Sequence, residues 1–275
     1  MELSSIFPQG LVVLDLETTG LSPLVHEIIE IGAVKINANG QCQFFESFVR
    51  PEKKIEYENF LIHGINNQMV EKARPISAVL KEFFDFIQGY PLLGHNLTVD
   101  IGFLTMDAIK NHLQLPASSL LDSCSLARYV LNRSEQLENY KLSSLCQYFS
   151  IDLPFHRAVA DSLASFYVTA EVLNLMSADE VENTLNTKAY LFQWDQLSQE
   201  SIKINQISPI LQSALLSGDV IKISYDGGSQ GREPRPIRPI SIIPMPTGLV
   251  LYAECLMSGL NKSFKIKKIL NFQEN

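Results

Sequence analysis

Two carboxylates at the end of an apolar segment are the first residues of this sequence that could do chemistry. Residues 11–20 read LVVLDLETTG, in which Asp15 and Glu17 interrupt a run of leucine and β-branched residues. Such a run predicts a buried strand, and residues two apart on a strand point to the same face. Buried acids are rare unless they are paired, hydrogen-bonded or bound to a metal ion.

A metal ion explains this pair better than burial alone. Backbone donors could satisfy one buried acid, but two carboxylates on one face repel each other unless a cation lies between them. Carboxylate oxygens are the ligands that Mg²⁺ and Mn²⁺ prefer. The pair therefore predicts a divalent-metal site, and further acids are expected at the ends of other elements.

Three later residues are candidates for the same site. Asp100 follows an apolar segment and a turn, where it could equally be a helix N-cap. Asp161 lies in a helical segment, where an ordinary exposed acid is the alternative. His156 precedes Asp161 by five residues, which does not place the two on one helix face. We expect His156 on the loop before the helix, and a surface loop histidine is its alternative.

Three motifs in this order resemble the DEDDh (DnaQ-like) family of 3'–5' exonucleases. They are DLETTG at 15–20, GHNLTVD at 94–100 and HRAVAD at 156–161, and EIIEIGAV at 27–34 and HGI at 63–65 add to the likeness. The resemblance covers about residues 8–176. Val99 departs from the aromatic residue that the family usually has there, and Phe103 could supply that bulk.

The resemblance implies a ribonuclease-H-like α/β fold and a two-metal hydrolysis of nucleic acid from the 3' end to nucleoside monophosphates. The metals would be Mg²⁺ or Mn²⁺, with Asp15 bridging the two ions and His156 acting on the attacking water as general base. The implied metal ligands are Asp15, Glu17, Asp100 and Asp161. The substrate-contacting residues are expected to be Thr18, Thr19, Gly20, His63, Ile65 and Asn96.

Apolar patterns predict the elements that position these residues. We expect three strands between residues 10 and 50, and a short strand at PLLGHN. Helices are predicted at 66–73, 77–88, 100–112, 123–131, around KLSSLCQYF and at 158–175. Strands followed by interleaved helices indicate a layered α/β domain with a mixed sheet flanked by helices.

The composition changes after residue 176. We predict an exonuclease domain at 1–176, a helical connector at 177–216 and a small all-β domain at 217–275. Within the connector, Ser177 and Glu180 form a capping-box pattern. Short β-rich runs between Gly and Pro turns predict the last domain.

The C-terminal segment resembles a WYL domain, a small SH3/Sm-like β-barrel of bacterial regulators. KSFKIKKI carries lysines where that family has arginines, and LVL replaces the signature Trp-Tyr-Leu. Its basic residues could bind nucleic acid or a nucleotide, or they could be a solvated edge that protects strands from aggregation. This accessory patch is predicted to contain Arg235, Arg238, Lys262, Lys265 and Lys268.

Charge and cysteine content limit the partners and the setting. The net charge is -8, yet residues 217–275 carry eight basic and five acidic residues. An acidic first domain disfavours a broad nucleic-acid-binding face but allows a metal-lined cleft. No apolar run reaches membrane-spanning length, and the four cysteines are scattered, so we expect a cytoplasmic protein without a zinc site.

Two other functions remain open at this point. The chain could be a regulatory nucleic-acid-binding protein in which the nuclease fold is a scaffold. It could also be a proofreading subunit, which would need a polymerase or repair partner because the chain has no polymerase motif. The partner nucleic acid is expected to be a single-stranded 3' end, and the sequence does not distinguish DNA from RNA.

Overall fold

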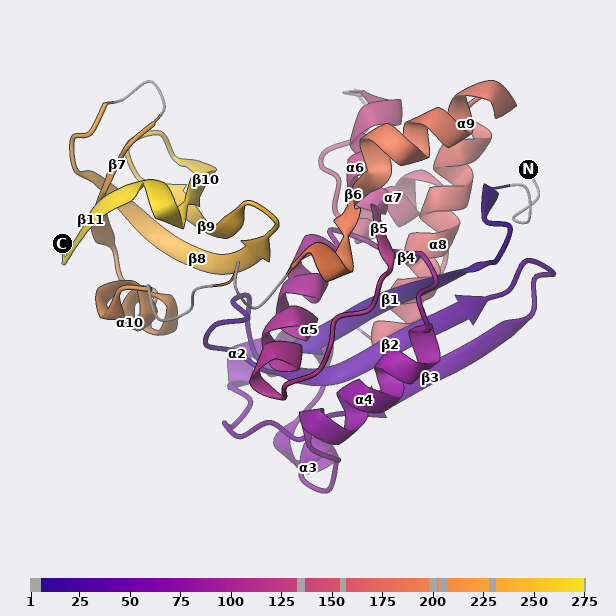
Figure 1. The fold of residues 1–275 in the computed structure, drawn as a ribbon, viewed down its shortest axis with the longest axis horizontal. Helices are drawn as coiled ribbons and strands as arrows, with labels where there is room; N and C mark the ends of the chain where they lie inside the picture. The colour runs from indigo at the N-terminus through magenta and orange to yellow at the C-terminus, as the bar shows by residue number, and fades with distance from the viewer. Residues whose placement is uncertain are drawn as a thin grey trace.

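The computed structural model describes residues 6–132, 137–153, 157–197, 202, 207–227 and 231–274. Figure 1 shows a large sheet with helices around it and a second, smaller sheet beside it. The larger sheet has the strand order β3-β2-β1-β4-β5-β6. Its strands are β1 (Leu11–Thr18), β2 (Ile28–Ile36), β3 (Cys42–Phe48), β4 (Leu92–Gly94), β5 (Ser119–Asp122) and β6 (Tyr190–Gln193).

The larger sheet is mixed, as predicted. β1 pairs antiparallel with β2 and parallel with β4, β4 pairs parallel with β5, and β6 pairs antiparallel with β5. β3 forms the other edge through its antiparallel pairing with β2. β1 therefore lies in the middle of the sheet, which explains why its residues 11–14 are all fully buried.

Most predicted helices are confirmed with small shifts of their ends. Three elements, α2, β5 and β6, were not predicted, because they are short and carry weak periodicity. The helices that surround the larger sheet are α2 (Tyr57–His63), α3 (Asn67–Val70), α4 (Ile76–Ile87), α5 (Thr98–Lys110), α6 (Ser123–Leu131), α7 (Leu142–Tyr148), α8 (Ala158–Asn174) and α9 (Ala178–Thr184).

The two faces of β1 belong to different cores. Val12, Leu14 and Leu16 pack with buried residues of α4 and α5. Leu11 and Val13 pack on the opposite face with α6, α7 and α8. Figure 1 shows α4 and α5 on one side of the sheet and α8 on the other. Because side chains alternate along a strand, Asp15 and Glu17 continue the face that α8 covers.

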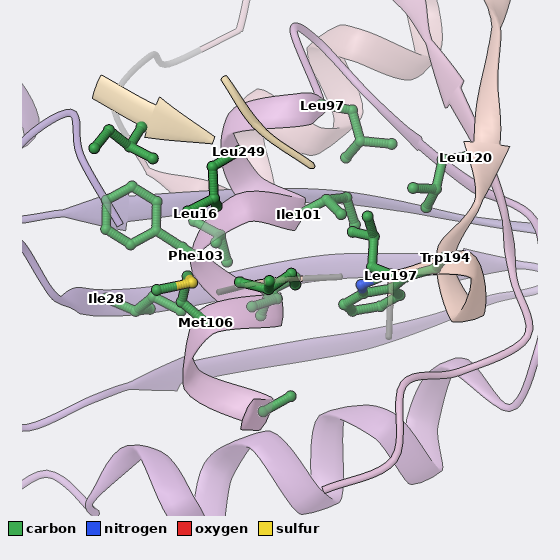
Figure 2. Packing of buried hydrophobic residues seen from close by; sticks show 14 of the residues in the cluster. Leu16, Ile28, Leu97, Ile101, Phe103, Met106, Leu120, Trp194, Leu197 and Leu249 are labelled. Atoms are coloured by element: carbon green, nitrogen blue, oxygen red, sulfur yellow. The ribbon is translucent and has the colours of Figure 1, made fainter. Parts of the chain in front are cut away.

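The segment predicted as a helical connector also contributes to the larger sheet. After α9 comes a π-helical turn at Leu185–Ala189, followed by β6 and a short 3₁₀ helix at Trp194–Gln196. Trp194 is completely buried, and its Nε1 donates a hydrogen bond to Thr105 Oγ1 at 2.8 Å. Figure 2 shows Trp194 among the hydrophobic residues beside α5. The predicted capping box of Ser177 and Glu180 is present at the start of α9.

The second sheet is antiparallel, with the strand order β10-β9-β8-β7-β11. It follows α10 (Pro209–Ser217). Its strands are β7 (Ile221–Tyr225), β8 (Arg235–Met245), β9 (Gly248–Cys255), β10 (Leu260–Lys265) and β11 (Ile269–Glu274). The all-β character of this segment is confirmed. Among the described residues β10 and β11 are the two edges, so the sheet is open in its pairing and a closed barrel is not confirmed.

The two sheets share one hydrophobic core through α5. Ile242, Leu249 and Leu251 of the second sheet belong to the same buried cluster as Ile101 and Phe103 of α5. Leu249 reaches toward α5 in Figure 2. The Ile242 amide also donates to Ser22 Oγ at 3.4 Å. The second sheet is therefore packed against the helix that carries Asp100. No helix of the described residues is long and apolar enough to cross a membrane.

Candidate active site

Asp15 and Glu17 lie near the end of β1, on the same face, as the sequence predicts. Opposite them on β2, Asp15 pairs with Gly32 and Glu17 pairs with Glu30. The ladder becomes irregular between Glu17 and Thr18, where the strand ends. The two carboxylates thus stand on a rigid buried strand at the point where the sheet gives way to a turn.

Helix α8 brings Asp161 to these two residues. Carboxylate oxygens of Asp15, Glu17 and Asp161 all lie within 4.8 Å of one another. Gly32 makes this approach possible, because a Cβ there would meet the backbone N of Val159 at 2.3 Å. Ser162 Oγ lies 3.1 Å from the Gly32 carbonyl oxygen and 2.7 Å from that of Ala158, so its hydroxyl proton is shared between β2 and the first turn of α8. Asp161 is 9% exposed, so an ordinary exposed helical acid is excluded.

Asp100 is hydrogen-bonded to β1 at Leu16, the residue between Asp15 and Glu17. The Leu16 amide donates a hydrogen bond to Asp100 Oδ1 at 3.1 Å. Asp100 is the third residue of α5, whose N-cap position is occupied by Leu97, so the N-cap alternative for Asp100 is wrong. Asp100 does not belong to the group of three close carboxylates, but it adjoins them through this hydrogen bond and through its charge.

Burial and mutual repulsion raise the pKa values of these acids. Burial, followed by repulsion from Asp100, Asp161, Glu17 and Glu30, raises the pKa of Asp15 well above its usual range. Burial also raises the pKa of Glu17 to about 8 and that of Asp100 to about 7. The hydrogen bond from Leu16 opposes the shift of Asp100. A divalent cation would relieve this repulsion.

Glu30 and Arg157 form an ion pair beside the carboxylates that the sequence analysis missed. Glu30 is 1% exposed, and Arg157 directly precedes α8. The Arg157 Nη2 and Nε atoms lie 2.8 and 3.1 Å from Glu30 Oε1. Glu30 stands in the quoted EIIEIGAV motif, and a charged residue inside a buried strand was the available signal. His156, the predicted general base, lies outside the described residues.

A second buried acid that the sequence analysis missed, Asp122, supports the loop before α5. Asp122 Oδ1 accepts hydrogen bonds from the amides of Asn96 and Leu97 at 2.6 and 3.2 Å. It also caps α6 through the Ser125 amide at 3.1 Å. Only the fold brings Asp122 to this loop, because 26 residues separate it from Asn96.

His95 reinforces the same loop from its other side. Its Nε2 donates to the Tyr140 carbonyl at 2.8 Å, which leaves Nδ1 to accept from Ser123 Oγ at 2.8 Å. Burial lowers the pKa of His95, consistent with this neutral state. The loop that leads into the Asp100 helix is thus held by two polar anchors.

The turn after β1 is partly exposed at Thr18 and Gly20 and buried at Thr19, and hydrogen bonds hold it in place. Thr18 Oγ1 donates to the Gly20 carbonyl at 2.7 Å, and Thr19 Oγ1 accepts from the Glu27 amide at 3.0 Å. The Thr19 carbonyl accepts from Asn59 Nδ2 of α2 at 2.8 Å. Gly20 has a φ of +154°, and a Cβ there would come within 2.5 Å of the His26 ring.

The other predicted substrate residues differ in exposure. Asn96 is exposed and adopts a left-handed conformation with a φ of +60°. His63 is buried, and its Nδ1 accepts from the Ile65 amide at 3.0 Å. Ile65 is completely buried in a small cluster with Ile29, Ile55 and Val70. The Ile65 side chain therefore supports α3 through Val70.

The structure does not bring the five predicted C-terminal basic residues onto one face. Arg235 is buried, and its Nη2 donates to the Gly231 carbonyl at 2.8 Å. Arg238 pairs with Glu254 at 3.5 Å. Lys262 shares a strand face with the buried Phe264, whereas Lys265 points to the opposite face.

The KSFKIKKIL segment, one of the β-rich runs of the C-terminal domain, is interrupted. Residues 262–270 are not one strand, because a 3₁₀ turn at Ile266–Lys268 separates β10 from β11. Lys268 therefore lies outside both strands. Lys267, which was not predicted, is exposed beside it.

Comparison with known proteins agrees with this geometry. The model of the Exonuclease family (RNase_T) matches residues 12–169. This range contains the three close carboxylates, Asp100 and both anchors of its loop. The second sheet lies outside the matched range.

Curated relatives include polymerases and a nuclease. The PolC-type DNA polymerase III of Caldanaerobacter subterraneus subsp. tengcongensis is 29% identical over 273 residues, covering 96% of this chain and 19% of that protein. The 3'-5' exonuclease DinG of Bacillus subtilis is 37% identical over 169 residues, covering 60% of this chain and 18% of that protein. The chain thus spans less than one-fifth of the length of these relatives.

Solved structures share the fold. The nuclease domain of 3'hExo, a DEDDh family member bound to rAMP, has a TM-score of 0.54 at 21% identity and covers 65% of this chain and 96% of that chain. E. coli Exonuclease I in complex with a dT13 oligonucleotide has a TM-score of 0.56 at 14% identity and covers 97% of this chain and 66% of that chain. The second likeness extends into the C-terminal sheet. Together these comparisons agree with a ribonuclease-H-like sheet flanked by helices.

Proposed function

Because this chain belongs to the Exonuclease family, we propose that it is a divalent-metal-dependent 3'–5' exonuclease. It would hydrolyse a nucleic acid from the 3' end and release nucleoside monophosphates. The observation that carries the proposal is the convergence of Asp15, Glu17 and Asp161 within 4.8 Å, on the sheet face that α8 covers. Three carboxylates this close together and this little exposed are costly unless they bind a cation.

The residues present fit Mg²⁺ or Mn²⁺. Oxygens that share an octahedral ion at about 2.1 Å lie about 3 to 4 Å apart, so the three carboxylates need only small side-chain rotations. Burial and then repulsion between the acids raise the pKa values of Asp15 and Glu17, and a bound cation would offset that repulsion. Asp15, Glu17, Asp100 and Asp161 would hold the ions.

The bound ions would supply a reactive water and neutralise charge on the scissile phosphate. The chain's own residues would do the rest. His156 would accept the proton of the attacking water, the role that the family resemblance assigns to it. The backbone of Thr18, Thr19 and Gly20, in the turn after β1, would approach the terminal nucleotide.

Other residues would define where the substrate strand lies. Asn96 is exposed at the loop before α5 and could contact the substrate directly. His63, the last residue of α2, would pack against the terminal base or sugar of the substrate. The buried Ile65 would support α3 behind it. Backbone and stacking contacts do not read base identity, so we expect little sequence preference.

The C-terminal sheet is proposed to hold the substrate strand outside the active site. The support is its position against α5 together with the net positive charge of residues 217–275. Lys265 and Lys268 are the exposed members of the predicted patch that have no ion pair among the described residues. Reversing both charges should weaken oligonucleotide binding at low salt, where phosphate contacts contribute most. Unchanged affinity would leave this sheet with a structural role only.

A proofreading role is the second candidate. It is favoured by the PolC-type DNA polymerase III relatives, one of which aligns with 96% of this chain. In this role the site would be the same and a polymerase would supply the 3' end. A pull-down with a purified replicative polymerase, followed by a mismatch-excision assay, would test it.

The main proposal is tested with oligonucleotides labelled at the 5' or the 3' end, as single-stranded and duplex DNA and RNA. With Mg²⁺ or Mn²⁺ we expect stepwise shortening of the 5'-labelled strand and release of labelled monophosphate from the 3'-labelled strand. EDTA should stop both. Asp15→Asn is the matched control for a contaminating nuclease. If the wild-type protein shortens no strand with either metal, the proposed function is wrong.

A further inference from the structure

Glu30 occupies an unusual position for a buried acid. It lies on β2 directly opposite Glu17, and the two side chains share the sheet face that carries the carboxylate cluster. Cross-strand pairs of like charge destabilise a sheet. Glu30 is not one of the three close carboxylates, so cation binding by those three does not explain why it is there.

Arg157 offsets the negative charge of Glu30 through hydrogen bonds from two of its guanidinium nitrogens. Its Nη2 and Nε lie 2.8 and 3.1 Å from Glu30 Oε1, and Nε lies 3.3 Å from Oε2. The Ala158 amide donates to Glu30 Oε2 at 3.2 Å. Glu30 therefore receives hydrogen bonds from the last residue before α8 and from its first residue. Arginine suits this role because its planar fork fixes an orientation that a lysine does not.

The same segment makes a second attachment two residues further along β2. Gly32, two residues after Glu30, contacts the first turn of α8 closely, and its carbonyl accepts from Ser162 Oγ at 3.1 Å. Asp161 lies between these two attachment points in the sequence. The position of the Asp161 carboxylate beside β1 thus depends on how α8 is attached to β2.

We propose that Glu30 and Arg157 are a positioning pair, which fixes the first turn of α8 on β2 so that Asp161 can bind metal together with Asp15 and Glu17. This inference rests on the proposed function, because it concerns the same metal site. Neither residue of the pair belongs to the carboxylate cluster itself. The pair acts through the geometry of α8.

A purely electrostatic role makes the opposite prediction. The positive charge of Arg157 lowers the pKa of Glu17, against the larger effects of burial and of the neighbouring acids. Replacing Arg157 with a neutral residue adds one net negative charge beside the site. If charge alone mattered, a divalent cation would then bind more tightly. If position matters, the cation binds more weakly despite the added negative charge.

The experiment is a calorimetric titration of Mn²⁺ into the full chain, with melting temperatures measured in EDTA to verify folding. Variants are Arg157→Gln, Arg157→Lys and the double variant Glu30→Gln with Arg157→Gln, which keeps the wild-type net charge. Glu46→Gln is the matched control, because it removes the exposed second partner of Arg157, which lies 2.8 Å from Nη2.

We expect Mn²⁺ affinity to fall about tenfold in Arg157→Gln, Arg157→Lys and the double variant, as for residues that orient metal ligands from outside the coordination shell. Glu46→Gln should stay within about twofold, the scale of exposed ion pairs. Excess Mn²⁺ should restore kcat in Arg157→Lys without changing KM for a short oligonucleotide, a response that general destabilisation would not give.

Tighter Mn²⁺ binding in Arg157→Gln, with unchanged binding in Arg157→Lys, would overturn the inference in favour of charge alone. Unchanged binding in all variants would overturn it as well. If Arg157→Gln does not fold, Arg157→Lys decides, because it keeps the charge and changes only the geometry. These outcomes differ from failure of the proposed function, in which the wild-type chain itself neither binds Mn²⁺ nor shortens an oligonucleotide.

Discussion

The backbone amide of Leu16 donates a hydrogen bond to Oδ1 of Asp100 at 3.1 Å. Leu16 is the residue between Asp15 and Glu17, and its own side chain packs into the core on the α4 and α5 side of the sheet. Leu16 therefore links the hydrophobic core on the α4 and α5 side, through its side chain, to the acids of the site, through its amide. The bond fixes one oxygen of Asp100 and leaves the other for a ligand role.

Replacing Asp100 separates its two roles. In Asp100→Asn the side-chain oxygen can still accept from Leu16, so the fold should be kept while the charge is lost. We expect activity to fall by about 100-fold or more, beyond the loss typical of residues outside the metal shell. The rise in melting temperature on adding Mn²⁺ should shrink in parallel. Wild-type activity in this variant would show that Asp100 is not a metal ligand.

Asp100→Leu should behave differently from Asp100→Asn. It leaves the buried Leu16 amide without its acceptor, which costs about 1–3 kcal/mol of unfolding free energy. Urea denaturation in EDTA measures this loss without a metal contribution. Equal stability of the two variants would mean that the hydrogen bond contributes nothing.

The metal-free protein should lose stability as the pH rises. Burial raises the folded-state pKa of Glu17 to about 8 and that of Asp100 to about 7, whereas both acids titrate near pH 4 when unfolded. Between these values the folded state binds more protons than the unfolded state, so stability decreases with pH. We expect the melting temperature in EDTA to fall steadily from pH 5 to pH 8.

Divalent metal should reverse this trend, because metal ions and protons compete for the same carboxylates. The increase in melting temperature on adding Mn²⁺ should therefore be larger at pH 8 than at pH 6. Asp15→Asn removes one of the repelling charges and serves as the comparison. It should melt higher than wild type in EDTA at pH 8, and it should gain little from Mn²⁺. A flat pH profile in EDTA would contradict the raised pKa values.

The positions of Asp15 and Glu17 can be predicted from sequence because a local pattern determines them. An apolar run with two acids two apart is enough to place Asp15 and Glu17 on one strand face, and the structure confirms that placement. Their association with Asp161 required the family resemblance, since nothing local connects residues 15 and 161. The role of His156 stays a prediction, because that residue lies outside the described part of the chain.

The supporting residues could not be predicted for a physical reason. Asp122 anchors the loop before α5, and Glu30 anchors α8, through partners 26 and 127 residues away. Such pairings depend on strand order and helix docking, which no short pattern encodes. Strand β6 was missed likewise, because it has only four residues and follows a segment of helical composition.

Gly32 should tolerate no side chain. A Cβ there would meet the backbone of Ala158 and Val159 at 2.4 and 2.3 Å, and backbone atoms cannot move aside cheaply. In Gly32→Ala we expect α8 to shift away from β2, with loss of both Mn²⁺ binding and nuclease activity. Calorimetry and the 3'-end assay measure these effects.

Gly102→Ala is the matched control for that change. A Cβ at Gly102 would lie 3.4 Å from Ile243 and Pro23, which is ordinary contact. The change should keep activity and could add up to about 1 kcal/mol through helix propensity. If Gly32→Ala retained wild-type metal binding, close packing of α8 on β2 would not be needed for the site.

Replacing Trp194 should lower the free energy of unfolding as much as replacing a large core residue of the exonuclease domain, because it belongs to the same hydrophobic cluster. It is completely buried, makes an edge-to-face contact with Phe84 and donates to Thr105 Oγ1 at 2.8 Å. Trp194→Ala should cost about 3–5 kcal/mol of unfolding free energy, the usual loss for a large buried aromatic residue. Trp194→Phe keeps most of the packing and should cost less, mainly through the unpaired Thr105 hydroxyl. Because Trp194 is the single tryptophan of the chain, urea unfolding has to be followed by circular dichroism in both variants. A loss below about 1 kcal/mol in Trp194→Ala would show that the segment after α9 is a separate connector, because core truncations of this size cost more.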